Sequence, residues 1–208
     1  AKKLGFDSWG IDSSPVAVAI AKAKLACCEA DAPLELAERF LAEVQPAHIP
    51  NSSFFDSAYH PETLREVCVL REALLGLDVE TDASAILRAA ILGCLHGPRP
   101  KNPDSAAYFS NQMPRTYASK PDYAVRFWKE RELVAPKIDV LKVLRRKIER
   151  FTGLAKQAPG SINQVIQGDA QLVHTYATFS EAPCLIITSP PYYGMRTYVQ
   201  DQWLRNWF

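Results

Sequence analysis

The chain has 208 residues, of which 48% are hydrophobic and 23% charged, and its formal net charge is +1. This length can bury a core and predicts one domain that carries an insertion. No stretch approaches the ~18 apolar residues of a transmembrane helix, and no signal-peptide pattern opens the chain. We therefore expect a cytoplasmic protein with no membrane partner.

Charge is distributed unevenly along the chain. The net charge is −6 for residues 1–96, +8 for residues 97–160 and −1 for residues 161–208. A basic central third is expected where a chain faces a polyanion, and a solvated helix surface gives the same composition.

The cysteines form no CxxC pair and have no His-x-His cluster nearby. This pattern argues against a disulfide framework and against a metal site. We expect reduced core thiols at Cys27, Cys28, Cys68, Cys94 and Cys184.

The first 29 residues predict a strand followed by a helix. Phe6–Ile11 has the length of a short strand and closes on Asp12. One of the serines at 13 and 14 is then suited to the N-cap, and Pro15 to the first helical position. An acidic residue that ends a strand in such a crossover accepts hydrogen bonds from a ribose diol. The alternative role for Asp12 is that of a second N-cap.

The long middle of the chain is predicted to be mainly helical, because apolar residues recur there at spacings of three and four. A loop is expected over Asn51–Pro61, where two phenylalanines serve as packing anchors. The expected helical segments are Leu34–Val44, Pro61–Leu77, Asp82–Gly97 and a long region from Asp122 to about Phe151.

A proline-punctuated loop over Gly97–Pro121 mixes cations with aromatic residues. Cations neutralise phosphates and aromatic rings stack on unpaired bases, so the mixture fits a nucleic-acid groove; a mobile surface loop is the alternative. The helical region that follows continues the basic character. The candidate nucleic-acid contacts are Arg99, Lys101, Arg115, Tyr117, Lys120, Arg126, Lys129, Arg145 and Arg146.

A second strand is predicted within Ile162–Ala170, where apolar and polar residues alternate. Gly168 at its end allows a ligand to approach the backbone closely. Asp169 follows at the strand end, as a ligand acceptor or as a turn residue, and Ala170 is the next residue.

The segment CLIITSPPYYGMRTY begins at Cys184. Its apolar run Leu185–Ile187 predicts a short buried strand, which Pro190 and Pro191 must end because they cannot donate to a ladder. The stiff loop after it presents the Ser189 hydroxyl, unpaired carbonyls and the Tyr192 ring. These groups suit a planar ring that carries an amino group. The last residues, from 201 to 208, have apolar residues at helical spacing and are expected in the core.

Two of these motifs carry a family resemblance. TSPPYYG resembles the catalytic motif of S-adenosylmethionine-dependent amino-methyltransferases, in a form most similar to the DNA cytosine-N4 branch. GIDSSPVAVAIAKAKL resembles the stretch that holds the cofactor ribose in the same family. The resemblance implies catalytic roles for Ser189, Pro190, Pro191 and Tyr192. It implies cofactor contacts at Asp12, Ser13, Gly168, Asp169 and Ala170.

The expected fold class is therefore α/β: a partial Rossmann-like methyltransferase sheet, formed by residues 1–29 and 161–208, with a helical insertion over residues 30–160. The family's glycine-rich loop would lie before Ala1. We therefore expect this chain by itself to bind S-adenosylmethionine weakly.

The expected function is methyl transfer from S-adenosylmethionine to the amino group of a base flipped out of double-stranded DNA. Cytosine N4 is favoured over adenine N6, because adenine enzymes more often carry Asp or Asn at the position of Ser189. Two alternatives stay open. One is a non-catalytic DNA-binding subunit of a restriction or phage-defence complex, which would supply partner subunits. The other is an N-methyltransferase that acts on RNA or on a protein amide.

Overall fold

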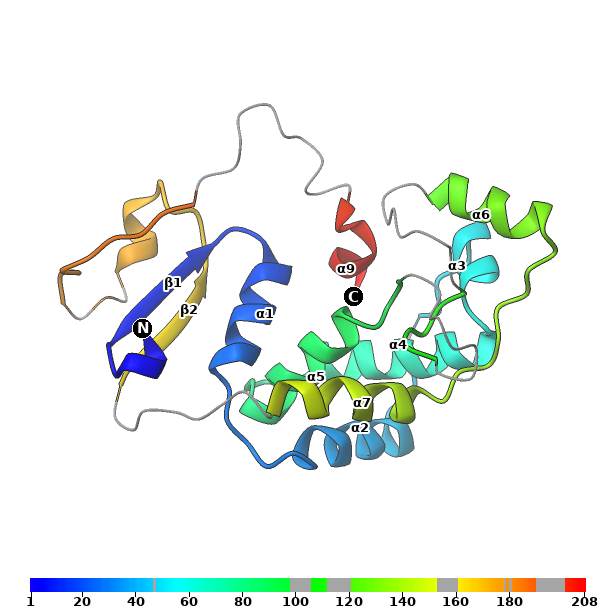
Figure 1. Cartoon of the computed structure of the whole chain (residues 1–208), viewed down its shortest axis with the longest axis horizontal. Coiled ribbons are helices and arrows are strands. Elements are labelled where there is room, and N and C mark those ends of the chain that lie inside the picture. The colour runs from blue at the N-terminus through cyan, green and yellow to red at the C-terminus, as the bar shows by residue number, and fades with distance from the viewer. Residues whose placement is uncertain are drawn as a thin grey trace.

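The computed structural model describes residues 1–46, 48–97, 106–111, 121–152, 161–177, 179, 181–189 and 201–208. Over these ranges the chain is a mixed α/β protein, mostly helical, with a small two-stranded parallel sheet (Figure 1). Figure 1 shows the sheet on one side of the molecule, most helices on the other, and α1 between them. The elements are η1 (Lys2–Leu4), β1 (Ser8–Asp12), α1 (Pro15–Leu25), α2 (Ala32–Glu43), α3 (Ser53–Ala58), α4 (Pro61–Leu75), α5 (Asp82–Leu92), α6 (Pro121–Glu130), α7 (Val140–Thr152), β2 (Asn163–Gln167), η2 (Val173–Tyr176) and α9 (Trp203–Trp207).

Both strands form where the sequence predicts them. They pair in parallel and in register over their whole length, with Asp12 opposite Gln167. The backbone N–H of Gly168 extends the ladder by donating to the carbonyl of Asp12 over 3.1 Å. Because parallel strands end at the same edge, the two acidic residues predicted as ligand acceptors follow neighbouring strand ends.

Helix α1 begins as its sequence predicts. The Ser14 hydroxyl accepts from the backbone N–H of Ala17 over 3.3 Å, and Pro15 is the first helical residue. The small side chains of α1 let it pack closely on α5, and its contacts also reach the sheet. Its last turns contribute Ala23 and Ala26 to the same hydrophobic core that the helices of residues 30–160 build.

Helices α2, α4 and α5 confirm three predicted amphipathic segments. Helix α5 begins with a capping box, in which the Thr81 hydroxyl accepts from the Ser84 backbone and the Ser84 hydroxyl accepts from the Thr81 backbone. It ends at Leu92, five residues before the glycine predicted to end it, because Gly93 is already its C-cap.

Two parts of the helical prediction are wrong. The expected loop at Asn51–Pro61 contains the short helix α3, whose phenylalanines are buried. The expected long helical region is two helices, α6 and α7, separated by residues 131–139. The break includes Glu132 at a φ of 51° and Pro136, which has no N–H for a helical ladder.

The third predicted strand is also wrong. Leu185, Ile186 and Ile187 form no strand, and 73%, 74% and 86% of their respective surfaces are exposed. An apolar run becomes a strand only when a neighbouring strand accepts its hydrogen bonds. No such pairing reaches residues 181–189 from the rest of the described chain.

The C-terminal helix α9 confirms the predicted core role of the tail. Its aromatic rings pack on α3: the centroids of Phe54 and Trp203 lie 4.9 Å apart, and those of Phe55 and Trp207 lie 4.8 Å apart. Edge-on and tilted pairs at such distances contribute beyond simple burial. Residues 201–208 therefore belong to the helical core.

Two of the five cysteines are buried, two are exposed, and Cys28 is intermediate. Cys68 and Cys94 are buried as predicted, and burial raises the pKa of each thiol to about 11. Cys27 and Cys184 are exposed, so the core prediction is wrong for these two. Within the described residues, no helix is long and apolar enough to cross a membrane.

Candidate functional site

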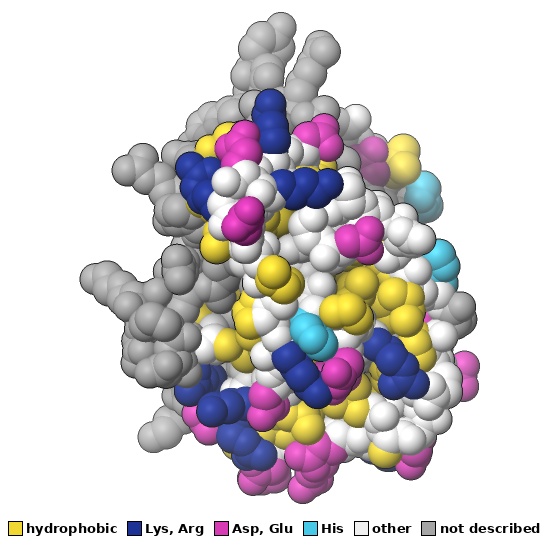
Figure 2. Space-filling view, turned by 90° about the vertical axis from the view of Figure 1, so that its right-hand side faces the viewer, with side chains coloured by type: hydrophobic (Ala, Val, Ile, Leu, Met, Phe, Trp, Pro, Cys, Tyr) yellow, Lys and Arg dark blue, Asp and Glu magenta, His cyan; other side chains and the backbone are white. Residues whose placement is uncertain are grey.

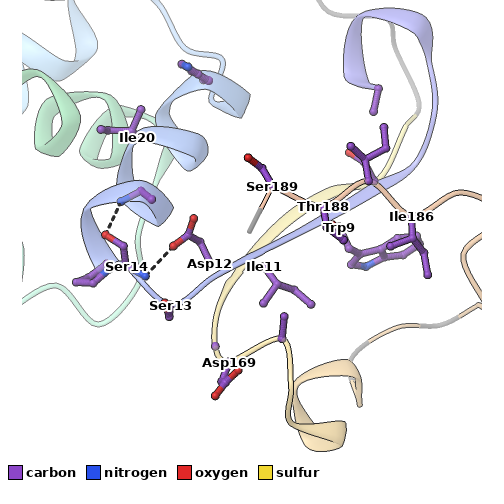
Figure 3. Close-up of a pocket in the computed structure, with 18 of the residues that line it drawn as sticks. Trp9, Ile11, Asp12, Ser13, Ser14, Ile20, Asp169, Ile186, Thr188 and Ser189 are labelled. Carbon is purple, nitrogen blue, oxygen red and sulfur yellow. Dashed lines mark hydrogen bonds between the residues drawn. The ribbon is translucent and has the colours of Figure 1, made fainter. Parts of the chain in front are cut away.

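A large, open cavity runs along β1 and α1, from residues 1–8 at the amino end of the sheet to its carboxyl edge (Figure 3). It has a volume of about 2610 Å³ and is bounded by β1, α1, α9 and residues 181–189. Ordinary small-molecule pockets measure roughly 300–1,000 Å³, so this hollow can take more than one small molecule. Six predicted site residues from three separate segments line it: Asp12, Ser13, Gly168, Asp169, Ala170 and Ser189.

Asp12 lies between the end of β1 and the start of α1. Its Oδ1 accepts from the backbone N–H of Ser14 over 2.8 Å, so the carboxylate helps to organise the turn into α1. Figure 3 shows this carboxylate turned toward the N-terminus of α1. The N-cap of α1 is Ser14, so Asp12 holds the turn before the helix and is not a second N-cap. Its Oδ2 makes no hydrogen bond with the described residues.

Asp169 has a similar local role after β2. Its Oδ1 accepts from the backbone N–H of Gln171 over 2.8 Å, and its carbonyl accepts from the Thr175 hydroxyl over 2.8 Å. A Cβ on Gly168 would lie 2.7 Å from Cγ2 of Thr175. The close approach at this glycine is therefore made by the chain's own η2 segment.

Ser189 is the last described residue of the apolar segment, and it lines the cavity together with Thr188. Figure 3 shows Ser189, Asp12 and Asp169 around the same edge of the sheet. The remaining predicted catalytic residues, Pro190, Pro191 and Tyr192, lie outside the described residues.

Apolar and aromatic side chains form much of the cavity wall. The Trp9 ring packs against Phe179 with centroids 5.3 Å apart. Ile11, Ile20 and Ile186 add aliphatic surface. Apolar walls with a few carboxylate and hydroxyl acceptors at one edge suit a flat, hydrogen-bonding ligand.

The predicted nucleic-acid contacts are only partly described. Arg99, Lys101, Arg115, Tyr117 and Lys120 lie outside the described residues. Arg126 and Lys129 are exposed on α6. Figure 2 shows the end of the molecule that carries α6, where Lys and Arg side chains are interleaved with Asp and Glu.

The two predicted contacts on α7 have partners within the chain. Arg145 forms an ion pair with Asp31 over 3.6 Å, and Arg146 donates to the carbonyl of Ala106 over 3.3 Å. Both side chains remain exposed.

Three cavity-lining cations were missed by the sequence reasoning: Lys24 on α1, Lys147 on α7 and Arg205 on α9. For Lys24 a signal exists, because it lies four residues after Ile20 on the same face of a helix. Lys147 and Arg205 belong to helices that meet the cavity only through tertiary packing, so local spacing could not identify them.

The buried, titratable side chain of His96 lies near the cavity-lining residue Arg205. His96 is only 9% exposed, and its Nδ1 is hydrogen-bonded to the Ser110 hydroxyl over 2.8 Å. Burial, with a smaller contribution from the Arg205 charge, lowers the pKa of His96 to about 4. The imidazole is therefore neutral at physiological pH.

No family model, curated protein or solved structure matches this chain. In the part of the chain that the structure describes, no three His, Cys, Asp or Glu side chains are grouped as metal ligands.

Proposed function

We propose that this chain forms part of an S-adenosylmethionine-dependent DNA amino-methyltransferase with a Rossmann-like core. The observation that carries the proposal is the common cavity. Asp12 is more than 150 residues from Asp169 and Ser189 in the sequence, and all three line the same cavity, which extends to the carboxyl edge of the sheet. Open α/β sheets bind their ligands at this edge.

The described residues fit the cofactor. The Asp12 carboxylate keeps one oxygen that can accept from a ribose diol, and Asp169 offers an equivalent oxygen to an adenine amino group. Trp9 and the isoleucines nearby supply apolar surface for a flat ring. When bound, S-adenosylmethionine would supply an electrophilic methyl group.

The family resemblance assigns the target amine to the loop that begins at Ser189. The Ser189 hydroxyl and the Pro190 carbonyl would accept its hydrogens, and the Tyr192 ring would stack on the base. These acceptors localise the nitrogen lone pair, and catalysis then depends on positioning and electrostatics. Cytosine N4 is the favoured target and adenine N6 the second.

The cavity size supports a base that leaves the duplex. Enzymes that modify a base inside DNA must flip it out, at a cost of a few kcal/mol. In this proposal the basic segment of residues 97–160 holds the backbone. Partner subunits from a restriction or phage-defence system would complete the assembly.

A non-catalytic DNA-binding subunit is the second candidate. One observation favours it: Asp12 and Asp169 each use one carboxylate oxygen to hold a turn of their own backbone. These residues can therefore be explained without a ligand.

Saturation-transfer NMR at millimolar S-adenosylmethionine tests the cofactor site, because the method detects weak binding. Asp12→Asn keeps an oxygen for the Ser14 N–H and removes the charge. We expect it to weaken binding about tenfold, the effect of losing a charged hydrogen bond. Asp78→Asn is the matched control, since Asp78 is exposed and does not line the cavity. Equal signals from wild type and Asp12→Asn would count against the site.

Mass spectrometry of nucleosides from DNA incubated with the protein and S-adenosylmethionine tests the methyl transfer itself. We expect N4-methylcytosine, and its loss in Ser189→Ala. DNA binding without any methylated nucleoside would favour the non-catalytic subunit.

A further inference from the structure

Two cations on the helical wall of the cavity reach the C-terminal end of α5. The Arg205 Nε donates to the carbonyl of Leu92 over 3.1 Å, and its Nη1 donates to Gln202 over 2.8 Å. The Lys147 ammonium lies 2.9 Å from the position that a Cβ on Gly93 would take. Leu92 and Gly93 are consecutive, so both side chains reach the same, C-terminal end of α5.

Neither cation has a carboxylate partner within the described ranges. Arg205 donates to two neutral acceptors, the Leu92 backbone carbonyl and the Gln202 side chain, and the ion pairs of the described chain involve other residues. Neighbouring like charges repel, and the carbonyl end of α5 offsets this only in part. Such a pair attracts an anion, and a concave wall strengthens that attraction by focusing the field.

The environment of this pair shows the effect of its charge. Arg205 is the second cause, after burial, of the lowered pKa of His96. Lys147 opposes the rise that burial causes in the pKa of Cys94. Both cations thus act on buried groups behind the cavity wall.

We propose that Lys147 and Arg205 bind a backbone phosphate of a nucleic-acid strand that enters the cavity. This inference rests on the proposed function and deepens it by naming a phosphate subsite. Lys supplies a compact charge and Arg a planar donor fork, and both bind phosphate oxygens. The cavity of about 2610 Å³ is large enough for a polymer segment.

A purely structural role is the competing explanation. Cations near the carbonyl end of a helix stabilise it without any ligand. In that case, replacing Lys147 or Arg205 would lower the thermal midpoint and leave nucleic-acid binding unchanged. The two explanations therefore predict different measurements.

The test is fluorescence anisotropy of the 208-residue chain with a labelled single-stranded DNA oligonucleotide over a range of salt concentrations. Lys147→Gln and Arg205→Gln should each lower the slope of log affinity against log salt by about 0.7. The ratio of the wild-type affinity to the variant affinity should therefore fall about 2.6-fold between 50 and 200 mM salt, because a slope difference of about 0.7 acts over a fourfold change in salt. Lys147→Arg keeps the charge and should bind like wild type.

Lys142→Gln is the matched control, because it removes one exposed positive charge from the same helix outside the cavity lining. If wild type binds the oligonucleotide and Lys147→Gln behaves like Lys142→Gln, the phosphate subsite is wrong and the proposed function stands. If wild type binds no oligonucleotide at any salt concentration, the phosphate subsite is overturned, and the proposed function is judged by the S-adenosylmethionine and nucleoside measurements. Thermal midpoints of every variant show whether it folds; if Arg205→Gln unfolds, the comparison of Lys147→Gln with Lys147→Arg decides.

Discussion

Acidification should destabilise the helical core through His96. The imidazole is buried among Phe54, Trp128 and Ser110, with ring centroids 6.4 Å from Phe54 and 6.1 Å from Trp128. Its pKa is about 4 in the folded protein and 6.5 when unperturbed. The unfolded chain therefore binds the proton first. The stability that the neutral imidazole contributes is fully present above about pH 6.5 and is lost as the pH falls toward 4.

The magnitude follows from linkage. At pH 5 the unfolded imidazole is almost fully protonated and the folded one almost fully neutral. The free energy of unfolding should be lower than at pH 7.5 by about 2 kcal/mol through this residue alone. For a domain of this size, a loss of 2 kcal/mol is a substantial share of the total stability.

Urea unfolding followed by tryptophan fluorescence measures this loss, because Trp128 lies beside the histidine. The comparison protein is His96→Asn, whose amide takes the place of Nδ1 toward Ser110 and does not titrate. Other groups titrate over the same range, and the subtraction between the two proteins cancels them. The reasoning is refuted if wild type and His96→Asn lose the same stability between pH 7.5 and pH 5.

Two further predictions concern packing. The buried Thr63 hydroxyl accepts from the Ile138 N–H over 3.0 Å. Thr63→Val leaves that donor unpaired and should lower the free energy of unfolding by about 1–3 kcal/mol. Thr63→Ser keeps the hydroxyl, loses only a methyl group and should cost roughly 0.8 kcal/mol. Equal losses in urea unfolding would contradict this. Gly168→Ala should cost about 1–3 kcal/mol, because its Cβ would meet Cγ2 of Thr175 at 2.7 Å. Thr175→Ser removes that methyl and should restore stability in the double variant; no rescue would show that the contact with the Thr175 methyl is not responsible.

Local chemistry made several elements predictable. Serine before proline determines the start of α1, since one supplies a cap and the other has no N–H to lose. The alternation of apolar and polar residues around Val165 predicted β2. The acidic residues Asp12 and Asp169 marked where the two strands end. The tail was recognisable as core because its aromatic residues recur at helical spacing.

Other features depend on partners that a local pattern does not contain. The run Leu185–Ile187 has strand propensity, but propensity supplies no neighbour to accept its hydrogen bonds. Arg145 belongs to a basic helix face, yet Asp31, more than a hundred residues earlier, is its ion-pair partner. The cavity cations Lys147 and Arg205 were likewise hidden, because only tertiary packing brings α7 and α9 to α5.

The parallel pairing of β1 with β2 has a consequence for how the edge is assembled. Ser8 and Asn163 are 155 residues apart in sequence, so closing this ladder requires the intervening chain to be compact first. The helices can gather through much shorter loops. We therefore expect the sheet edge to form late in folding, so that its geometry depends on the packing of the helices between the two strands.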